Sequence, residues 1–543
     1  MKEINRFMEF GLSLVLILAF LLLGCGPTQA PTQAPPTPSP FLPTEVPTTP
    51  PLPTAAPGEI SENVGTMAVS YGLPSLDPLR ELTTDHVIGF NVYDTLTRWD
   101  PDKGVMPWLA ESWGSNANGT EWTFHLRRDV KFHDGTPFTA QAAKFSYERS
   151  IEIGLMAYYF ADFQEIEATD DYTLRIKLSV PRPVPTLLSA GYGMFIVSPN
   201  DADKPQSWFE EGHDAGTGPY MIESAEPGVR IVLTQFKEYW GGWSEGQFTK
   251  VVIQVVQDAT VREQMVRAGE ADVTLEIPYE SHESLSATGE VDVLLAPVYA
   301  QYLYQFHLSR PAMDDVRVRQ ALAYSFPYED VQKVAYGGHA LIAQGLTPVG
   351  LWNPPPDWKG YSFDLAKARQ LLAEAGYPSG LKLKLAVLVG DENRNQQALL
   401  WQAELVKIGV ELQIEPVTNE AWWDAVYNPD NEFDMMGTNW WGGYASPREY
   451  MLLYDSAITF TPFTGYKNDA FEAFLNSAYT AEATDPKQAN ELYTQAQALL
   501  DRDAVAVWAL NFPMDYEFRS NIEGLKISPV YLDVVFWHDL SRK

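Results

Sequence analysis

The chain has 543 residues, of which 45% are hydrophobic and 20% charged. Its 71 acidic and 38 basic side chains give a net charge of −33, which argues against binding nucleic acid or an anionic lipid surface through a basic patch. A chain of this length exceeds what one hydrophobic core usually serves, so we expect at least two lobes with room for a cleft between them.

Residues 1–24 have the pattern of an export signal. Lys2 and Arg6 precede an apolar run from Phe10 to Leu23, which at 14 residues is short for a transmembrane helix. The run ends at Cys25, the only cysteine, so intrachain disulfides and thiol-ligated metal sites are excluded. The ending resembles a bacterial lipobox, which predicts a signal peptide and a lipidated Cys25 at the cell membrane; the alternative is a secretory signal with an incidental cysteine.

A proline- and threonine-rich segment follows the cysteine. Residues 26–58 hold 12 proline and 7 threonine residues and too little apolar surface to pack. Proline favours polyproline II at about 3.1 Å per residue, so the segment could reach roughly 100 Å. We therefore interpret residues 25–58 as the lipidated cysteine and a tether, with a globular part from about Glu59.

Two turns are predicted in the first half of the globular part. Val130–Gly135 alternates in hydrophobicity and ends in Asp-Gly, which predicts a strand that enters a tight turn, with Gly135 at positive φ. The segment Gly216–Pro219 predicts a second turn. His133 and Asp134 are accordingly interpreted as turn residues and not as catalytic ones.

Helices and a strand are predicted in the second half. Asp364 is placed to cap a helix that runs to Gly376, and a second helix is expected from about Asn393 to Ile408. Residues 410–416 have the pattern of a strand, and residues 487–500 that of a helix with one apolar face. A helix, a glycine and then a strand are typical of an α/β fold.

Sequence motifs of several common enzyme classes are missing. No Walker A loop is present, and His282-Glu283 has no second histidine at zinc-protease spacing. Gly191-Tyr-Gly193 begins a dinucleotide fingerprint, but Ile196 occupies its third glycine position. Carboxylates are too numerous for any pair to indicate a glycosidase. We predict no enzymatic activity, no cofactor and no metal site.

Seven segments, in order from about residue 65 to the end, resemble the family 5 extracytoplasmic solute-binding proteins, the group of oligopeptide- and dipeptide-binding proteins. They are Ser75–Pro78, Asn91–Leu96, Pro107–Trp113, Trp122–Thr139, Gly216–Tyr220, Asp315–Leu322 and Asp364–Tyr377. The resemblance implies the solute-binding component of an ABC importer, with permease and ATPase subunits as partners. Together with the lipobox and the acidic charge, it leads us to expect a lipid-anchored monomer that binds no nucleic acid.

The resemblance also implies a fold. The expected fold class is α/β, a two-lobed periplasmic-binding-protein type II fold with an extra domain inserted in the first lobe. Lobe I would comprise residues 59–98, 217–296 and 517–543, the inserted subdomain residues 99–216, and lobe II residues 297–516. A ligand would be enclosed between the lobes by hinge closure.

Ligand contacts in the family cluster on stretches that resemble Phe433–Pro447 and Ala68–Leu73. Peptide binders have there a tryptophan, two residues, an aspartate that pairs with the peptide's α-amino group, a tyrosine, two residues and a proline. Here Gly443 stands at the aspartate position, and a buried ammonium without a counter-charge costs several kcal/mol. The predicted ligand-binding residues are Trp440, Trp441, Gly443, Tyr444, Trp422, Trp423, Ser70 and Tyr71.

The nature of the ligand stays open at this point. A peptide needs an acid other than residue 443, whereas aromatic faces suit apolar side chains, cations or the C–H faces of sugars. The main hypothesis is an oligopeptide or related small solute, and the alternative is an oligosaccharide. A surface-tethered hydrolase and a purely structural surface protein are weaker alternatives.

Overall fold

The computed structural model describes residues 63–70, 75–80, 88–201, 204–226, 228–389, 392–458 and 462–543. They belong to one compact unit, Glu62–Lys543. The predicted signal peptide, Cys25, the tether and Tyr71 lie outside the described residues.

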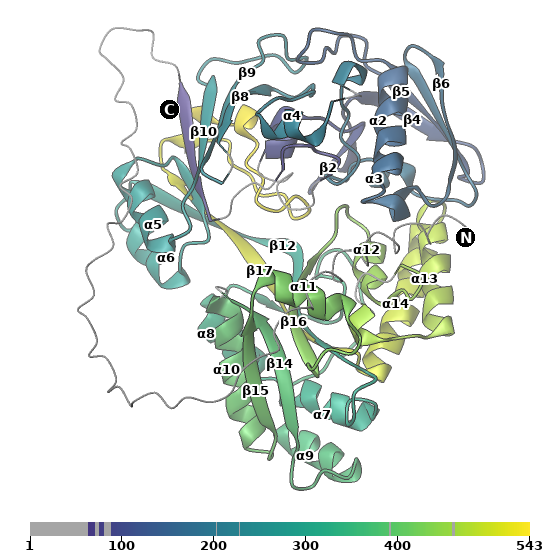
Figure 1. The fold of residues 1–543 in the computed structure, drawn as a ribbon, viewed down its shortest axis with the longest axis vertical. Helices are drawn as coiled ribbons and strands as arrows, with labels where there is room; N and C mark the ends of the chain where they lie inside the picture. Colours follow the sequence, from purple (N-terminus) through teal and green to yellow (C-terminus); the bar gives the residue numbers. More distant parts are fainter. Residues whose placement is uncertain are drawn as a thin grey trace, which may run out of the picture. The chain divides into compact units, whose positions relative to one another are not determined.

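Among the described residues, eleven strands form one mixed sheet, in the order β15-β14-β16-β12-β17-β11-β1-β10-β9-β8, with β13 beside β17 (Figure 1). We call the part with β1 and β8–β11 lobe I, and the part with β14–β16 lobe II. The strands are β1 Val64–Val69, β8 Tyr220–Glu226, β9 Arg230–Gln235, β10 Lys250–Val255, β11 Val273–Leu275, β12 Val291–Phe306, β13 Leu341–Ile342, β14 Lys382–Leu388, β15 Glu411–Val417, β16 Met435–Trp441 and β17 Ala506–Arg519.

Two long strands, β12 and β17, connect the lobes. They pair antiparallel along most of their length, with a register shift between Pro297 and Gln301. On the lobe I side β17 also pairs with β11, and on the lobe II side β12 also pairs with β16. A rotation of one lobe relative to the other would therefore bend these two strands.

A second sheet, of four antiparallel strands in the order β4-β5-β7-β6, forms the inserted subdomain. Helix α2 packs on β6 and β7, and the buried face has its own apolar core. The hairpin β2-β3 precedes it, and β18 pairs with β19 near the C-terminus. These strands are β2 Thr97–Asp100, β3 Gly104–Pro107, β4 Ala110–Ser115, β5 Glu121–Leu126, β6 Phe163–Asp170, β7 Thr173–Leu178, β18 Ile522–Glu523 and β19 Ser541–Arg542.

Helices cover both lobes, and each lobe has a large apolar cluster of its own. Lobe II has a further cluster around α13 and α14. The α-helices are α1 Phe90–Val92, α2 Ala140–Ile153, α3 Val184–Leu187, α4 Gln206–Glu210, α5 Ala259–Ala268, α6 Tyr279–Ser286, α7 Val316–Ser325, α8 Tyr328–Tyr336, α9 Leu365–Glu374, α10 Glu392–Val406, α11 Asn419–Tyr427, α12 Pro447–Met451, α13 Asp469–Glu482 and α14 Pro486–Asp503.

The elements predicted in the second half are confirmed. Helix α9 begins after Asp364, whose side chain accepts a hydrogen bond from the Lys367 amide at 2.8 Å, as an N-cap should. Helices α10 and α14 and strand β15 lie where the apolar patterns predict them, within two or three residues. The patterns are strong here because each element buries one face against a neighbour.

The first-half turns are confirmed, but the strand predicted before Gly135 is wrong. Residues 130–132 pair locally with residues 136–138 through one isolated bridge, which is too short a pairing for a strand, and the His133 amide donates to the Gly216 carbonyl. Gly135 has φ +83° as expected. A Cβ on Gly216 would lie 1.9 Å from the Val92 carbonyl oxygen, so this close approach requires glycine.

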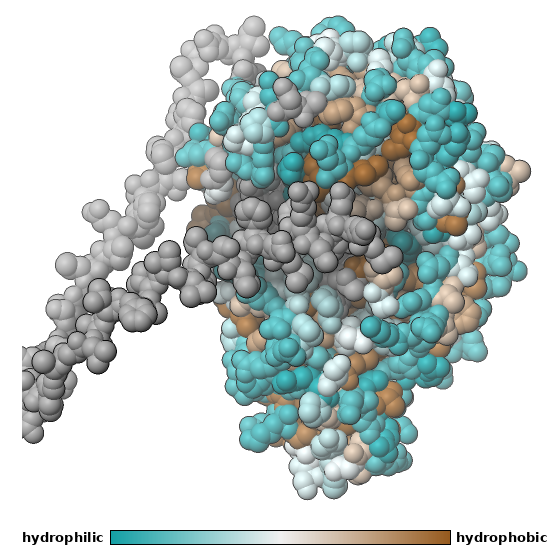
Figure 2. Space-filling view, turned by 45° about the vertical axis from the view of Figure 1, so that its right-hand side comes forward, coloured by the Kyte–Doolittle hydropathy of each residue, from teal (hydrophilic) through white to brown (hydrophobic). Residues whose placement is uncertain are grey.

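The face shown in Figure 2 is mostly hydrophilic, with apolar residues in smaller groups between the polar ones. Within the described part of the chain, none of the helices combines the length and the apolar character needed to cross a bilayer.

Candidate functional site

The last residues of β16 bring two predicted contacts to the junction of the lobes. Trp440 lies opposite Gln301 and Trp441 opposite Ala300 on β12, next to the register shift in the connecting strands. Residues 435–438 of β16 are buried, and the strand emerges to half-buried positions at its end. The two tryptophans are therefore carried to this junction by a well-buried strand.

Both indole N–H groups are hydrogen-bonded. Trp440 Nε1 donates to the Glu449 carbonyl at 3.0 Å, within lobe II. Trp441 Nε1 donates to the Tyr192 hydroxyl at 2.7 Å, and Tyr192 belongs to the apolar core of the inserted subdomain. Trp441 thus joins lobe II to that subdomain.

Tyr444 makes a second connection to the inserted subdomain. It is fully buried, and its ring packs at 5.5 Å and 69° against the ring of Tyr159. The turn that carries Tyr444 leads into α12, which begins after the cap residue Ser446. Lobe II and the inserted subdomain therefore share apolar surface at this turn.

Gly443, which stands where peptide binders have aspartate, lies against two tyrosines. A Cβ at Gly443 would lie 2.2 Å from the Tyr159 hydroxyl and 2.6 Å from Cδ2 of Tyr192. In this arrangement an aspartate does not fit at position 443. The two tyrosine rings fill the space that its side chain would need.

A different acid, Glu449 on α12, is directly beside this glycine. Its Oε2 accepts hydrogen bonds from the Tyr159 hydroxyl at 2.8 Å and from the Gly443 amide at 3.2 Å. Its Oε1 is buried and has no hydrogen-bond partner among the described residues. Burial raises the pKa of Glu449 to about 7, against the lowering effect of Arg448 and of these hydrogen bonds.

The other predicted contacts are not gathered at this point. Trp422, on α11, is buried in a small core of lobe II, and its Nε1 donates to the Gly437 carbonyl at 3.2 Å. Trp423 is 43% exposed and stacks on Tyr427. Ser70 follows β1, and its hydroxyl donates to the Glu276 carboxylate. A ligand role for these three residues remains a prediction.

Sequence reasoning missed Tyr159, Tyr192 and Glu449. The first two come from the inserted subdomain and reach Gly443 only through the fold, so no local pattern marks them. Glu449 lies two residues after Pro447, just beyond the family stretch, and an acid so close to the missing aspartate was a usable signal.

Two hollows in the described part of the chain lie elsewhere. One, of about 740 Å³, is in lobe II and is lined in part by Tyr324, Trp358 and Arg502. The other, of about 240 Å³, is in lobe I beside Arg230 and Ile253. Neither is lined by any predicted contact residue.

Comparison with known proteins identifies the family. A model described as the bacterial extracellular solute-binding proteins, family 5 Middle, matches residues 104–462, about two thirds of the chain. The chain belongs to this family. The predicted resemblance is confirmed, and the members of family 5 are solute-binding proteins.

Three relatives illustrate the similarity. The probable D,D-dipeptide-binding periplasmic protein DdpA of Escherichia coli is 28% identical, over 86% of this chain and 92% of that one. The periplasmic oligopeptide-binding protein OppA of Escherichia coli is also 28% identical, over 80% and 84%. The sequence of Helicobacter pylori DppA, whose structure was solved in complex with the peptide STSA, is 25% identical. The structural match covers 88% of this chain and 98% of that one, with a TM-score of 0.77.

This structural similarity, together with the two lobes and the second sheet, confirms the predicted fold class. The chain has the two-lobed family 5 binding-protein fold with an inserted subdomain. The residue ranges predicted for the three parts stay predictions.

Proposed function

We propose that this chain is the solute-binding lipoprotein of an ABC importer, that it captures oligopeptides or related small solutes between two closing lobes, and that it delivers them to a membrane permease without chemical change. The observation that carries the proposal is the junction at Gly443. Lobe II and the inserted subdomain meet there through Tyr159, Trp441 and Glu449, so closure would assemble the site from both sides.

Glu449 supports a ligand with a cationic group. Its carboxylate is buried at the junction, one of its oxygens has no hydrogen-bond partner in the described part of the chain, and aromatic rings lie beside it. An ammonium group bound there would offset the cost of burying the Glu449 charge. In peptide binders the aspartate of this stretch pairs with the α-amino group of the peptide in the same way. We propose Glu449 as the acid that replaces the aspartate missing at Gly443.

The similarity to relatives named for dipeptides and oligopeptides also favours peptides. Oligosaccharides are the second candidate, because Trp440 and Trp441 are only half-buried at the junction and flat indole rings suit sugar faces.

A thermal-shift screen tests both candidates. The protein from Glu59 onward is heated with a library of di- to hexapeptides and of oligosaccharides. A ligand at a hundredfold excess over its dissociation constant adds about 2.7 kcal/mol to the free energy of unfolding, which gives a clear melting shift. Shifts with peptides support the proposal, shifts with sugars alone favour the second candidate, and turnover of a ligand would contradict a pure binding role.

The lipid anchor at Cys25 is proposed from the lipobox-like sequence. In a bacterial host that processes lipoproteins, the full chain should fractionate with the membrane. A Cys25→Ala chain should not, because no lipid can be attached. Equal membrane association of the two chains would refute the anchor, and incorporation of labelled fatty acid only into the unmodified chain would support it.

A further inference from the structure

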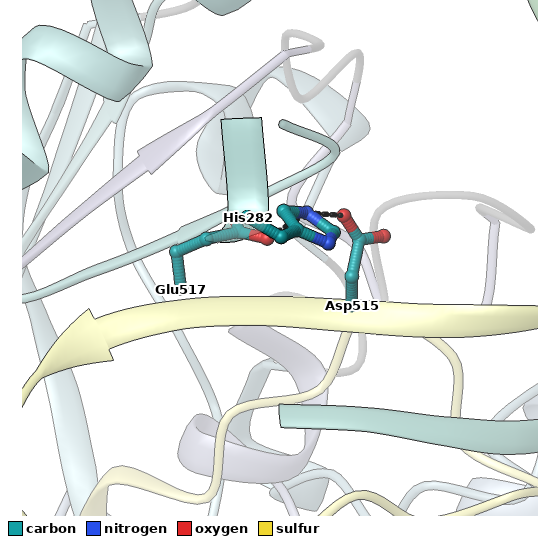
Figure 3. Close-up of side chains that lie close together, drawn as sticks. All are labelled: His282, Asp515 and Glu517. Carbon is teal, nitrogen blue, oxygen red and sulfur yellow. Dashed lines mark ion pairs between the residues drawn. The ribbon is translucent and has the colours of Figure 1, made fainter. Parts of the chain in front are cut away.

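Three ionisable side chains converge beside the connecting strand β17, on its lobe I side. Asp515 and Glu517 lie two residues apart on β17, so they project from the same face of the strand. His282 projects from α6 towards both of them (Figure 3). One donor atom from each residue lies within 4.8 Å of the other two.

These side chains are buried without the hydrogen bonds that burial normally demands. The Glu517 side chain is fully buried, and both of its carboxylate oxygens lack a hydrogen-bond partner among the described residues. The same holds for both ring nitrogens of His282 and for Oδ2 of Asp515, and these two side chains are only 9% and 8% exposed. His282 contacts both carboxylates, but two buried carboxylates beside one imidazole and without hydrogen bonds are costly, so they indicate a further partner.

Two of the distances between donor atoms suit ligands of one bound ion. His282 Nε2 lies 3.0 Å from Glu517 Oε1 and 3.3 Å from Asp515 Oδ2. Ligands placed about 2.0–2.1 Å from a Zn²⁺ ion lie roughly 3.0–3.4 Å from one another in octahedral or tetrahedral geometry. These two contacts are short but are not hydrogen bonds, so an ion shared by the three side chains would supply the interaction that their buried atoms lack.

Arg262 is the guanidinium near this cluster, and it does not supply the missing partner. Its N–H groups donate to the main-chain carbonyls of Leu275, Val256, Gln257 and Glu276. The remaining alternative to a bound cation is a proton on His282, which would make the cluster an imidazolium between two carboxylates.

We propose that His282, Asp515 and Glu517 form a binding site for a divalent first-row transition metal ion, with Zn²⁺ as the probe. One imidazole nitrogen and two carboxylate oxygens suit such an ion, whereas Ca²⁺ and Mg²⁺ prefer oxygen ligands alone. The ion would fasten α6 to a strand that connects the lobes. Sequence motifs predicted no metal site, because these residues come from distant parts of the chain.

Zn²⁺ binding to the full chain tests the site. The chain is stripped with a chelator and dialysed against Zn²⁺ in excess Mg²⁺, which occupies the many surface acids. One retained Zn²⁺ per chain is expected, and Co²⁺ in its place should give the visible absorption of an ion bound to nitrogen at low coordination number. Retention of no Zn²⁺ would overturn the proposal in favour of a protonated His282.

Variants locate the ion. His282→Gln and Glu517→Gln should each weaken Zn²⁺ binding by more than about tenfold, since even residues that only orient a ligand have effects of that size. His125→Gln, at an exposed histidine on β5, is the matched control and should bind as the unmodified chain does. An unchanged affinity in His282→Gln would overturn the site, and if a variant does not fold, the Co²⁺ spectrum of the unmodified chain decides. The outcome does not depend on ligand binding at Gly443.

Discussion

Glu449 and Gly443 together explain how this chain differs from peptide binders with an aspartate in the same stretch. The glycine amide and the Tyr159 hydroxyl both donate to Oε2 of Glu449, so the carboxylate lies directly beside the backbone of residue 443. An acid at residue 449 in place of residue 443 leaves room for the two tyrosines, which is the arrangement that we propose for the amine partner.

Replacing Glu449 by glutamine should weaken the binding of peptides with a free amino terminus. A hydrogen bond to a charged group contributes about 1.5–3 kcal/mol, so the dissociation constant should rise about tenfold or more in a calorimetric titration. Glu482→Gln is the matched control, because Glu482 is also buried but bonds to Ser446 and Tyr493. Equal affinities in Glu449→Gln and the unmodified chain would exclude Glu449 as the amine partner.

Adding a methyl group at Gly443 should oppose closure. The new Cβ of Gly443→Ala would meet Tyr159 and Tyr192, which belong to the inserted subdomain, so lobe II can fold but cannot approach them as closely. Overpacking of this kind costs about 1–3 kcal/mol, and ligand affinity should fall accordingly. Gly437→Ala, on the preceding strand β16, is the control, since its Cβ would have ordinary contacts of 3.4 Å or more. A Gly443→Ala protein that binds as tightly as the control would contradict this account.

Helix α9 shows which parts of the fold local sequence can predict. Its cap at Asp364, its apolar face and its end before Gly376 are all encoded within a dozen residues, and the prediction is confirmed. The strand predicted before Gly135 failed: the chain turns back after one bridge, and the His133 amide donates to Gly216, some eighty residues away. Pairing of that kind depends on the tertiary fold and leaves no local pattern.

The residues of the candidate site likewise divide into those that the sequence could predict and those that it could not. Trp440, Trp441 and Tyr444 could be predicted from a family pattern, and the fold brings them to the junction of lobe II and the inserted subdomain. Their partners Tyr159 and Tyr192 could not, since contacts between residues more than two hundred positions apart have no periodicity to detect. Two adjacent tryptophans on α11 illustrate the limit, because Trp422 is buried while Trp423 is exposed.

Loss of the α9 cap should destabilise the protein modestly. Asp364→Ala removes the acceptor of the Lys367 amide, and such changes cost about 1 kcal/mol. Urea unfolding should show a lower midpoint, whereas Asp364→Asn should keep most of the stability because asparagine caps equally well. A midpoint that falls equally in both variants would point to the charge of Asp364 and not to its cap.

Buried acids should make the stability of the whole protein depend on pH. Burial raises the pKa of Glu449, Glu482 and Asp501 to about 7, so between about pH 4.5 and 7 the folded chain holds protons that the unfolded chain releases. The free energy of unfolding should therefore fall as the pH rises through this window. Two of the three acids, Glu449 and Glu482, face Arg448 in lobe II, and Glu449 also bonds Tyr159 of the inserted subdomain.

Glu482→Gln isolates one of these contributions. A neutral amide needs no proton, so the fall in the free energy of unfolding between pH 5 and pH 8 should shrink by roughly 3 kcal/mol relative to the unmodified chain. Chemical unfolding at the two pH values measures it, and Glu420→Gln, at an exposed acid on α11, should leave the difference unchanged. If instead the unmodified chain gains stability from pH 5 to pH 8, these acids are ionised in the folded state, and the charge of Arg448 outweighs their burial.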